Sequence, residues 1–252
     1  LDGGTLAMGR NIVKTGANAS ATFNFNGGLL RAGLTSTTYM QGLTVATVGD
    51  GGALIDTNGF NITVGQALTH LGSASAIDGG LTKSGTGILT VTGANTYTGP
   101  TQVNGGTLQL NGSAATGLLP TSGVTVEAIG ALGFTAAAAS TLDLTGKPLT
   151  LSGGSIGFDV GAGVNDTITV QDFTLTANSA FTFDAIGAVA NGSTYTVLTS
   201  ANPISNSGSF TISGQTIGRV ILTPTINTDT ITVTASLNEG IWNQAGGGNW
   251  SN

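Results

Sequence analysis

The sequence predicts an all-β protein, a parallel β-helix (β-solenoid) in which successive coils of the chain stack on one another. Three observations lead to this prediction: glycine pairs recur at a nearly fixed spacing, short segments alternate apolar and polar residues, and helical patterns are missing. No run places apolar residues at three-and-four spacing with charged residues on the opposite face. The predicted molecule is a rod, in which each coil buries a thin slice of aliphatic side chains.

The glycine pairs follow one another at intervals of 24, 24, 28, 26 and 48 residues, and the last interval is twice 24. An aliphatic residue stands two positions after most of the pairs. A period in the twenties is typical of solenoids, whose coils each hold two or three short strands. With neighbouring strands about 4.8 Å apart, some ten coils predict a rod roughly 50 Å long. The pairs are Gly3-Gly4, Gly27-Gly28, Gly51-Gly52, Gly79-Gly80, Gly105-Gly106 and Gly153-Gly154.

Alternating segments predict strands along the whole chain. They are rich in Thr and Val, which fit a pleated strand, and the alternation places the aliphatic side chains on one face. Asn-Gly dipeptides between them suit tight corners, but they suit the hairpin turns of an antiparallel sandwich equally well. The regular period favours the β-helix. The segments include residues 5–8, 21–25, 43–46, 61–64, 88–91, 107–110, 124–126, 167–170, 181–183, 194–198 and 230–233.

The chain divides into three predicted parts. Residues 1–154 form regular coils, residues 155–238 form irregular closing coils or a β cap of the same solenoid, and residues 239–252 form a Trp/Gly-rich junction to a following module. The glycine pairs stop at the end of the first part, and the strands become longer and richer in Phe beyond it. In the second part, Asp166–Val170 and Asp229–Val233 share the sequence Asp-Thr-Ile-Thr-Val. Terminal repeats are usually atypical because they cover an open edge.

The composition narrows the range of partners. Of the 252 residues 42 are Gly and 7% are charged, with a formal net charge of −6. The basic residues are scattered along the sequence, so neither nucleic acid nor an anionic membrane surface is an expected partner. The chain has no Cys, which removes disulfides and thiolate sites and suits an extracellular protein. No membrane insertion is expected, because the longest apolar stretch, residues 128–142, is too short. The basic residues are Arg10, Lys14, Arg31, Lys83, Lys147 and Arg219.

Residues 79–112 carry a more specific pattern. They read GGLTKSGTGILTVTGANTYTGPTQVNGGTLQLNG. Residues 85–99 and the ending at 104–108 resemble the autotransporter-associated β-strand repeat, also called the passenger-associated transport repeat. The segment before them, residues 23–80, is similar to the lead-in to this repeat in large bacterial surface proteins, and residues 241–250 are similar to their Trp-rich junctions. The resemblance covers roughly the first half of the chain.

This resemblance implies a right-handed parallel β-helix that is secreted and presented at, or released from, a bacterial surface. In the family the repeat is a structural unit associated with passenger export and brings no catalytic residues. The family resemblance therefore predicts no catalytic site and no enzyme. It also implies that the chain is one module of a longer array.

Single residues with chemical potential are few. His70 is the only histidine, and its Gly-containing surroundings predict a structural or solvent-facing role. The densest acidic group is Asp159, Asp166, Asp172 and Asp184, at spacings of 7, 6 and 12. Acid–base work on a sugar needs paired carboxylates on adjacent coils, and these spacings are not one coil. We expect turn positions for these Asp residues.

Calcium and glycans are the remaining ligand classes to weigh. Residues 49–56, with Asp50 and Asp56, are a weak match to the nonapeptide that binds Ca²⁺ in β-rolls, and Asp159 with Asp166 could hold one hard cation. The sequence leaves the metal ligands undetermined and predicts no other cofactor. A sugar-binding platform needs several aromatic side chains on one face, whereas the aromatic residues here are few. They include Tyr39, Tyr97, Tyr195 and the pair Trp242 and Trp250, which is expected to plug the stack or dock on a neighbouring module.

The sequence therefore favours a structural β-solenoid module of a secreted bacterial cell-surface protein. The expected role is a rod or stalk, with end-to-end assembly into a filament because solenoid ends carry unpaired strand edges. Expected partners are other copies or neighbouring modules. An adhesin or glycan-binding passenger is the alternative, with surface glycans as its partners, and a polysaccharide-degrading β-helix enzyme is a third class.

Overall fold

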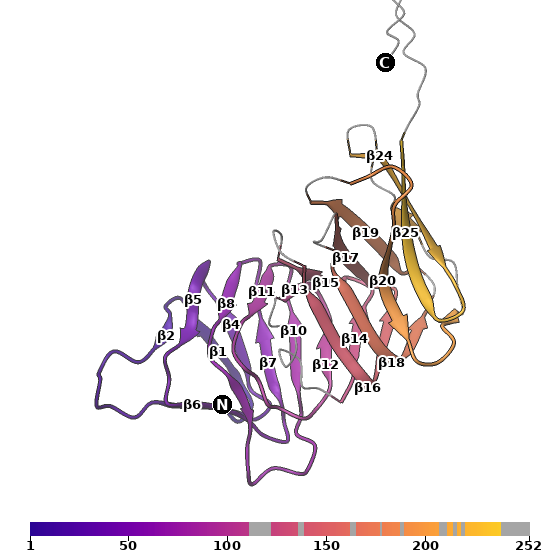
Figure 1. Ribbon diagram of the computed structural model, residues 1–252. Coiled ribbons are helices and arrows are strands. Elements are labelled where there is room, and N and C mark those ends of the chain that lie inside the picture. Colours follow the sequence, from indigo (N-terminus) through magenta and orange to yellow (C-terminus); the bar gives the residue numbers. More distant parts are fainter. Residues whose placement is uncertain are drawn as a thin grey trace, which may run out of the picture.

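The computed structural model describes residues 1–110, 122–135, 139–161, 165–176, 178–186, 189–206, 211–213, 216–217 and 220–237. The predicted Trp/Gly-rich junction at 239–252, with both tryptophans, lies outside the described residues. All the regular elements of the described part are β-strands, and they stack as coils along one axis (Figure 1). The predicted all-β solenoid with parallel coils is confirmed.

The first sheet is the spine of the rod. Nine of its strands pair in parallel from β1 to β20, one from each successive coil. Eight intervals of about 4.8 Å give roughly 40 Å, shorter than expected, because the later coils are longer and the chain reverses after β20. These strands are β1 (Thr5–Met8), β4 (Leu29–Ala32), β7 (Ala53–Asp56), β10 (Leu81–Ser84), β12 (Thr101–Val103), β14 (Val124–Glu127), β16 (Thr141–Ser152), β18 (Thr167–Leu175) and β20 (Thr194–Ser200).

The second sheet runs beside the first and is also parallel throughout its described length. Its strands are β2 (Ile12–Val13), β5 (Ser36–Gln41), β8 (Ile62–Val64), β11 (Ile88–Val91), β13 (Gly106–Leu110), β15 (Gly130–Phe134), β17 (Ser155–Val160), β19 (Ala180–Ala185) and β22 (Thr211–Ser213).

A third sheet covers only the first three coils, with parallel strands β3 (Thr22–Phe25), β6 (Val45–Val48) and β9 (Leu68–His70). In the next coil the segment that follows β11 continues this wall without forming a strand. There the backbone N–H groups of Thr96 and Tyr97 donate to the carbonyl oxygen of Leu68.

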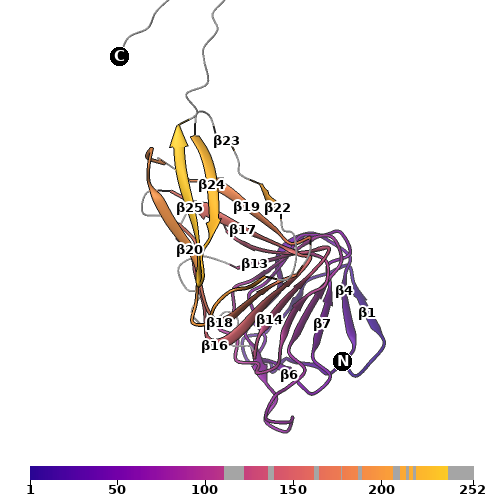
Figure 2. The ribbon, with the colours of Figure 1, turned by 90° about the vertical axis from the view of Figure 1, so that its right-hand side faces the viewer.

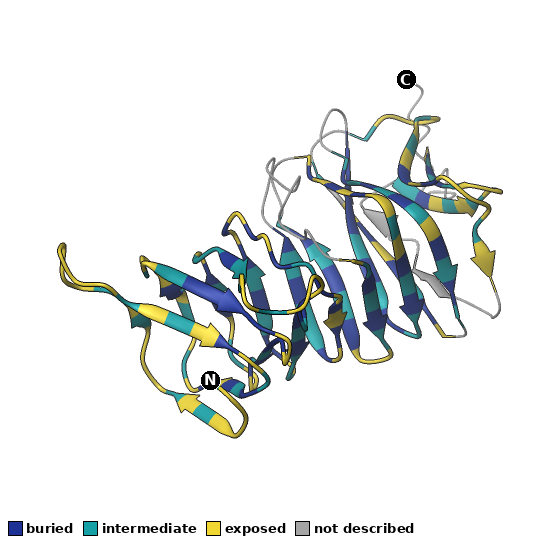
Figure 3. Ribbon diagram, turned by 90° about the horizontal axis from the view of Figure 1, so that it is seen from below, coloured by how far each residue is buried: buried dark blue, intermediate teal, exposed yellow. Residues whose placement is uncertain are grey.

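The core consists of side-chain columns that run along the rod. Alternation along each strand turns every second side chain inward, which Figure 3 shows as alternating bands of burial. The columns are aliphatic in the early coils and aromatic in the later ones, where the ring of Phe158 lies 6.1 Å from Phe134 and 5.8 Å from Phe183 between centroids. One column of the first sheet, set by the strand register, contains Leu30, Ile55, Lys83, Val103, Val126, Leu151 and Leu175.

The carboxyl-terminal strands reverse direction. Strand β25 (Thr230–Leu237) pairs antiparallel with β20, and β24 (Val220–Ile226) pairs antiparallel with β25 (Figure 2). The two Asp-Thr-Ile-Thr-Val segments therefore flank the same strand: Ile168 pairs with Leu198 in parallel, and Ile231 pairs with Leu198 antiparallel. Two short strands complete this end, β21 (Ser205–Asn206) beside β18 and β23 (Thr216–Ile217) beside β24.

Glycine pairs let the coils approach at the corner that leads into the first sheet. The backbone N–H of Gly27 donates to the carbonyl oxygen of Gly52 at 3.0 Å, one coil away. Gly80 has φ +69°, and a Cβ there would overlap the carbonyl oxygen of Pro100 in the next coil. A larger residue at Gly80 would therefore force two coils apart.

Candidate functional site

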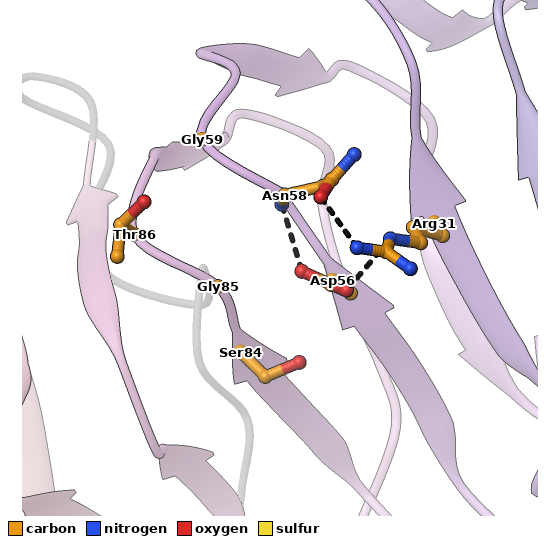
Figure 4. A pocket seen from close by; sticks show the side chains of 7 residues that line it. All are labelled: Arg31, Asp56, Asn58, Gly59, Ser84, Gly85 and Thr86. Atoms are coloured by element: carbon orange, nitrogen blue, oxygen red, sulfur yellow. Dashed lines mark hydrogen bonds and ion pairs between the residues drawn. The ribbon is translucent and has the colours of Figure 1, made fainter.

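A polar pocket opens on the corner between the first and second sheets. It has a volume of about 430 Å³ and draws its walls from three successive coils, at the ends of β4, β7 and β10 (Figure 4). The alternating pattern ends at these corners, so polar side chains and glycines replace the aliphatic residues. The lining residues are Arg31, Asp56, Asn58, Gly59, Ser84, Gly85 and Thr86.

Arg31 is held in place from two sides. Its Nε lies 3.3 Å from Oδ2 of Asp56, and its Nη2 donates to Oδ1 of Asn58 at 2.6 Å. Asn58 is in turn fixed, because its backbone N–H donates to Asp56 Oδ1 at 2.7 Å and its Nδ2 donates to the carbonyl oxygen of Ala32 at 3.1 Å. The Arg31 side chain remains 48% exposed, so part of a pre-positioned guanidinium faces the pocket opening.

The backbone at this corner depends on left-handed residues. Asn58 has φ +51°, Gly59 has φ +85° and Gly85 has φ +77°. A Cβ on Gly85 would overlap the Asp56 carboxylate. The close spacing of the coils here therefore keeps the pocket shallow and lined by the main chain.

Lys83 lies directly behind the pocket lining and is fully buried. Its Nζ donates hydrogen bonds to Oγ1 of Thr57 (2.9 Å) and to the carbonyl oxygens of Ser84, Gly85 and Gly105 (2.8 Å each). Burial lowers the pKa of Lys83 to about 8, and the nearby Asp56 carboxylate opposes that shift. The ammonium is thus a charged group inside the wall of the solenoid.

Two of the six basic residues therefore meet at one corner, although they are 52 positions apart in the sequence. The sequence analysis treated the basic residues as scattered and singled out neither Arg31 nor Lys83. A signal for Lys83 was available, because it stands at an inward position of the alternating segment Leu81–Ser84. Arg31 offered no comparable signal, since its partners come from the next coil.

Other polar residues of the same coil are buried too. The Tyr97 hydroxyl lies 2.8 Å from Oγ1 of Thr101, and both side chains are fully buried. Oδ1 of Asn95 accepts a hydrogen bond from the backbone N–H of Leu68 at 2.9 Å. Burial raises the pKa of Tyr97, so its hydroxyl stays protonated. These side chains serve the interior of the solenoid.

His70 lies at the start of the loop between β9 and β10, against a buried carboxylate. Its Nδ1 is 2.9 Å from Oδ2 of Asp78. Burial favours the protonated form of Asp78, but hydrogen bonds from Thr98, His70, Gly99 and Gly80 outweigh this and hold its pKa below the ordinary value. The pair fastens the loop after β9 to the next coil.

The acidic group is partly drawn together. Both carboxylate oxygens of the buried Asp166 accept backbone N–H groups, Oδ1 from Ser140 at 2.9 Å and Oδ2 from Asp159 at 2.8 Å. Burial raises the pKa of Asp166 to about 6 against these hydrogen bonds. Asp159 is the register partner of Asp184, and burial followed by the charge of Asp184 raises its pKa. Asp166 therefore acts as an internal staple of its turn.

The remaining candidates lie apart. Asp172 is exposed and accepts a hydrogen bond from Asn202 at 2.7 Å. Asp50 accepts from the backbone N–H of Ser75 at 2.7 Å, and Asp56 belongs to the pocket. Within the described ranges no three His, Cys, Asp or Glu side chains are grouped closely enough to hold a metal ion.

The tyrosines do not form a surface row. Tyr39 and Tyr97 are fully buried and Tyr195 is half-buried. Burial raises the pKa of Tyr39 to about 12. In the described part of the chain, no helix has the length and apolar character needed to cross a bilayer.

Comparison with known proteins places the corner in a recognised repeat. A family model described as the passenger-associated-transport-repeat matches residues 81–110, which contain Lys83, Tyr97 and Thr101. The chain is also 40% identical over 105 residues to the adhesin BmaC autotransporter of Brucella suis biovar 1 (strain 1330). That match covers 42% of this chain and 3% of the relative, so the chain spans a small fraction of the relative's length. The resemblance expected from residues 79–112 is confirmed: the chain is a β-solenoid that carries a passenger-associated transport repeat.

Proposed function

We propose that this chain is a structural rod module in the passenger of a secreted bacterial surface protein, without catalytic activity of its own. The observation that carries the proposal is the parallel register of nine strands across a stack that includes the transport repeat. Such a stack has rigidity along its axis and exposes a repeating polar surface. The similarity to a protein named as an autotransporter adhesin supports a location on the cell surface or outside the cell.

Antibodies against the chain test the location. We expect them to label intact cells of the source organism or to detect the protein in the medium. Labelling that appears only after the cells are broken open would contradict the proposed location.

The amino-terminal face supports joining to another β-coil. Strands β1, β2 and β3 are the outer strands of their sheets, so their outer backbone groups have no strand partner in the described chain. Their inward side chains, Leu6, Met8, Ile12 and Phe23, remain partly exposed beside the core. An added coil of a neighbouring module, or of a second copy in a filament, would cover this cross-section. Since the other end carries antiparallel strands, the amino-terminal face is the proposed joining face.

Charge placed on that face tests the joining. Leu6→Lys with Phe23→Lys should abolish concentration-dependent association measured by analytical ultracentrifugation and electron microscopy. Gln102→Lys, at an exposed position in the middle of the stack, is the matched control and should associate like the unchanged chain. An unchanged chain that stays monomeric at high concentration would rule out the filament.

The pocket favours a second candidate function, the binding of an acidic saccharide. The Arg31 guanidinium, held by Asp56 and Asn58, could receive a sugar carboxylate, and the hydroxyls of Ser84 and Thr86 could bond sugar hydroxyls. A volume of about 430 Å³ lies in the range of small-ligand sites. Binding of uronic-acid oligosaccharides, measured by calorimetry, should be lost in Arg31→Ala and retained in Arg10→Ala. Equal binding by both variants would remove the pocket from consideration.

A further inference from the structure

Lys83 stands in a column of the core where its neighbours are aliphatic. Its register partners are Ile55 in the coil before and Val103 in the coil after, and its side chain is completely buried. A charge buried in this way destabilises a protein unless other groups compensate it. Among the described residues Lys83 has no carboxylate within ion-pair distance.

The compensation comes from four neutral oxygens. The ammonium donates to Thr57 Oγ1 and to the carbonyl oxygens of Ser84, Gly85 and Gly105, at 2.8–2.9 Å. An ammonium has three N–H donors, so four acceptors more than satisfy it. The oxygens come from three successive coils, and Gly106, which follows the last of them, has φ +61°. The corners of three coils thus turn their oxygens toward one point inside the wall.

We infer that these four oxygens form a cation-binding cage for a primary ammonium ion, which the chain fills with its own Lys83. Converging neutral oxygens replace the hydration shell of a monovalent cation, as carbonyl rings do in ion-selective pores. The three N–H bonds of a primary ammonium add a directional requirement that a fully substituted ammonium cannot meet. Tethering the cation through an apolar stem lets it close the corner without any ion from solution. This inference is independent of the proposed function.

Removing the tether tests the cage. Lys83→Ala deletes Cγ, Cδ, Cε and Nζ, which are the heavy atoms of n-propylammonium. The variant is refolded in increasing n-propylammonium chloride and its unfolding by urea is followed by circular dichroism. Above the dissociation constant, the unfolding equilibrium constant should fall about tenfold for each tenfold rise in n-propylammonium.

Two other solutes separate a cation cage from an apolar cavity. 1-Propanol matches the stem without the charge, and tetramethylammonium matches the charge without N–H donors. Neither should stabilise Lys83→Ala. Equal stabilisation by 1-propanol, or no response of the folded variant to n-propylammonium, would overturn the inference.

A second variant covers the case in which Lys83→Ala does not fold under any condition. Lys83→Met keeps most of the stem volume and removes the ammonium, leaving four oxygens without their donor. Its urea midpoint should fall well below that of the unchanged chain, whereas Lys14→Met, at a half-exposed position after β2, should leave the midpoint unchanged. A Lys83→Met variant as stable as the unchanged chain would overturn the inference by itself.

Discussion

At the scale of single residues, the glycines differ in what they do. Gly80 and Gly42 both have φ +69°, a conformation that costs any other L-residue free energy. A Cβ on Gly80 would overlap the backbone of the next coil, whereas a Cβ on Gly42 would meet nothing within 4 Å. The pair therefore separates the cost of backbone conformation from the cost of coil packing.

Gly42→Ala should lower the free energy of unfolding by about 1 kcal/mol, the cost of the left-handed conformation alone. Gly80→Ala should lower it by about 3 kcal/mol or more, because two coils must also move apart. Urea unfolding of both variants checks this difference. Equal losses would show that the coils can separate at this corner at little cost.

The raised pKa of Asp166 makes stability depend on pH. Its folded pKa of about 6 exceeds the ordinary value of 3.8, so between these values the folded state binds more protons than the unfolded state. The contribution of Asp166 is therefore fully present below pH 4 and is lost as the pH rises through 6, with a size on the order of 2 kcal/mol. The raised pKa of Asp159 acts in the same direction.

Asp166→Asn should flatten the fall in unfolding free energy between pH 4 and pH 7. Asp229→Asn is a close control, since Asp229 begins the same five-residue sequence but is exposed. Urea midpoints at several pH values provide the measurement. An identical pH profile for both variants would show that Asp166 is not the group responsible.

At the scale of one element, the transport repeat places polar side chains inside the solenoid. Tyr97 and Thr101 bond each other where no water is needed, and Lys83 is satisfied by main-chain oxygens. A motif that looks polar in the sequence thus becomes part of the core. This placement explains why the repeat needs Tyr and Thr at these two positions in the fold.

Tyr97→Phe and Thr101→Val should each lower the free energy of unfolding by about 1–2 kcal/mol, because each leaves one buried hydroxyl without its partner. The double variant should lose less than the sum of the two, since no unsatisfied hydroxyl remains. A double-mutant cycle by urea unfolding measures the coupling. Strict additivity would mean that the hydrogen bond contributes nothing.

Much of the fold follows from local patterns in the sequence. The glycine period predicted the coils, and the alternating segments predicted the strands. The pocket could not be predicted, because Arg31, Asp56 and Asn58 meet only through the register of adjacent coils, and the coil length varies between 24 and 28 residues. The contact of His70 with Asp78 depends in the same way on how the loop after β9 folds back. The reversal at β25 was hidden as well, since its sequence matches that of a parallel strand.

At the scale of the whole molecule, the two ends differ. The first coil has a strand neighbour on one side only, whereas β10 to β13 have neighbours on both sides. Solenoid stability is close to a sum over neighbouring coils, so an end coil opens more easily.

Amide hydrogen exchange should therefore be fastest in β1 to β3 and slowest around β10 to β13, by about a hundredfold or more in protection factor. Exchange detected by mass spectrometry on peptides from each coil gives the profile. Uniform protection along the rod would show that the described chain unfolds as one unit without fraying from its amino end.

The direction of the hydrogen bonds between coils has a mechanical consequence. Neighbouring coils lie about 4.8 Å apart along the rod, and their hydrogen bonds point along the same axis. A pull between the two ends loads one rung at a time, so coils peel away in sequence. Each released coil of about two dozen residues pays out up to roughly 80 Å of chain. A tether built this way yields in steps under flow and dissipates a sudden tug before its anchorage feels the full force.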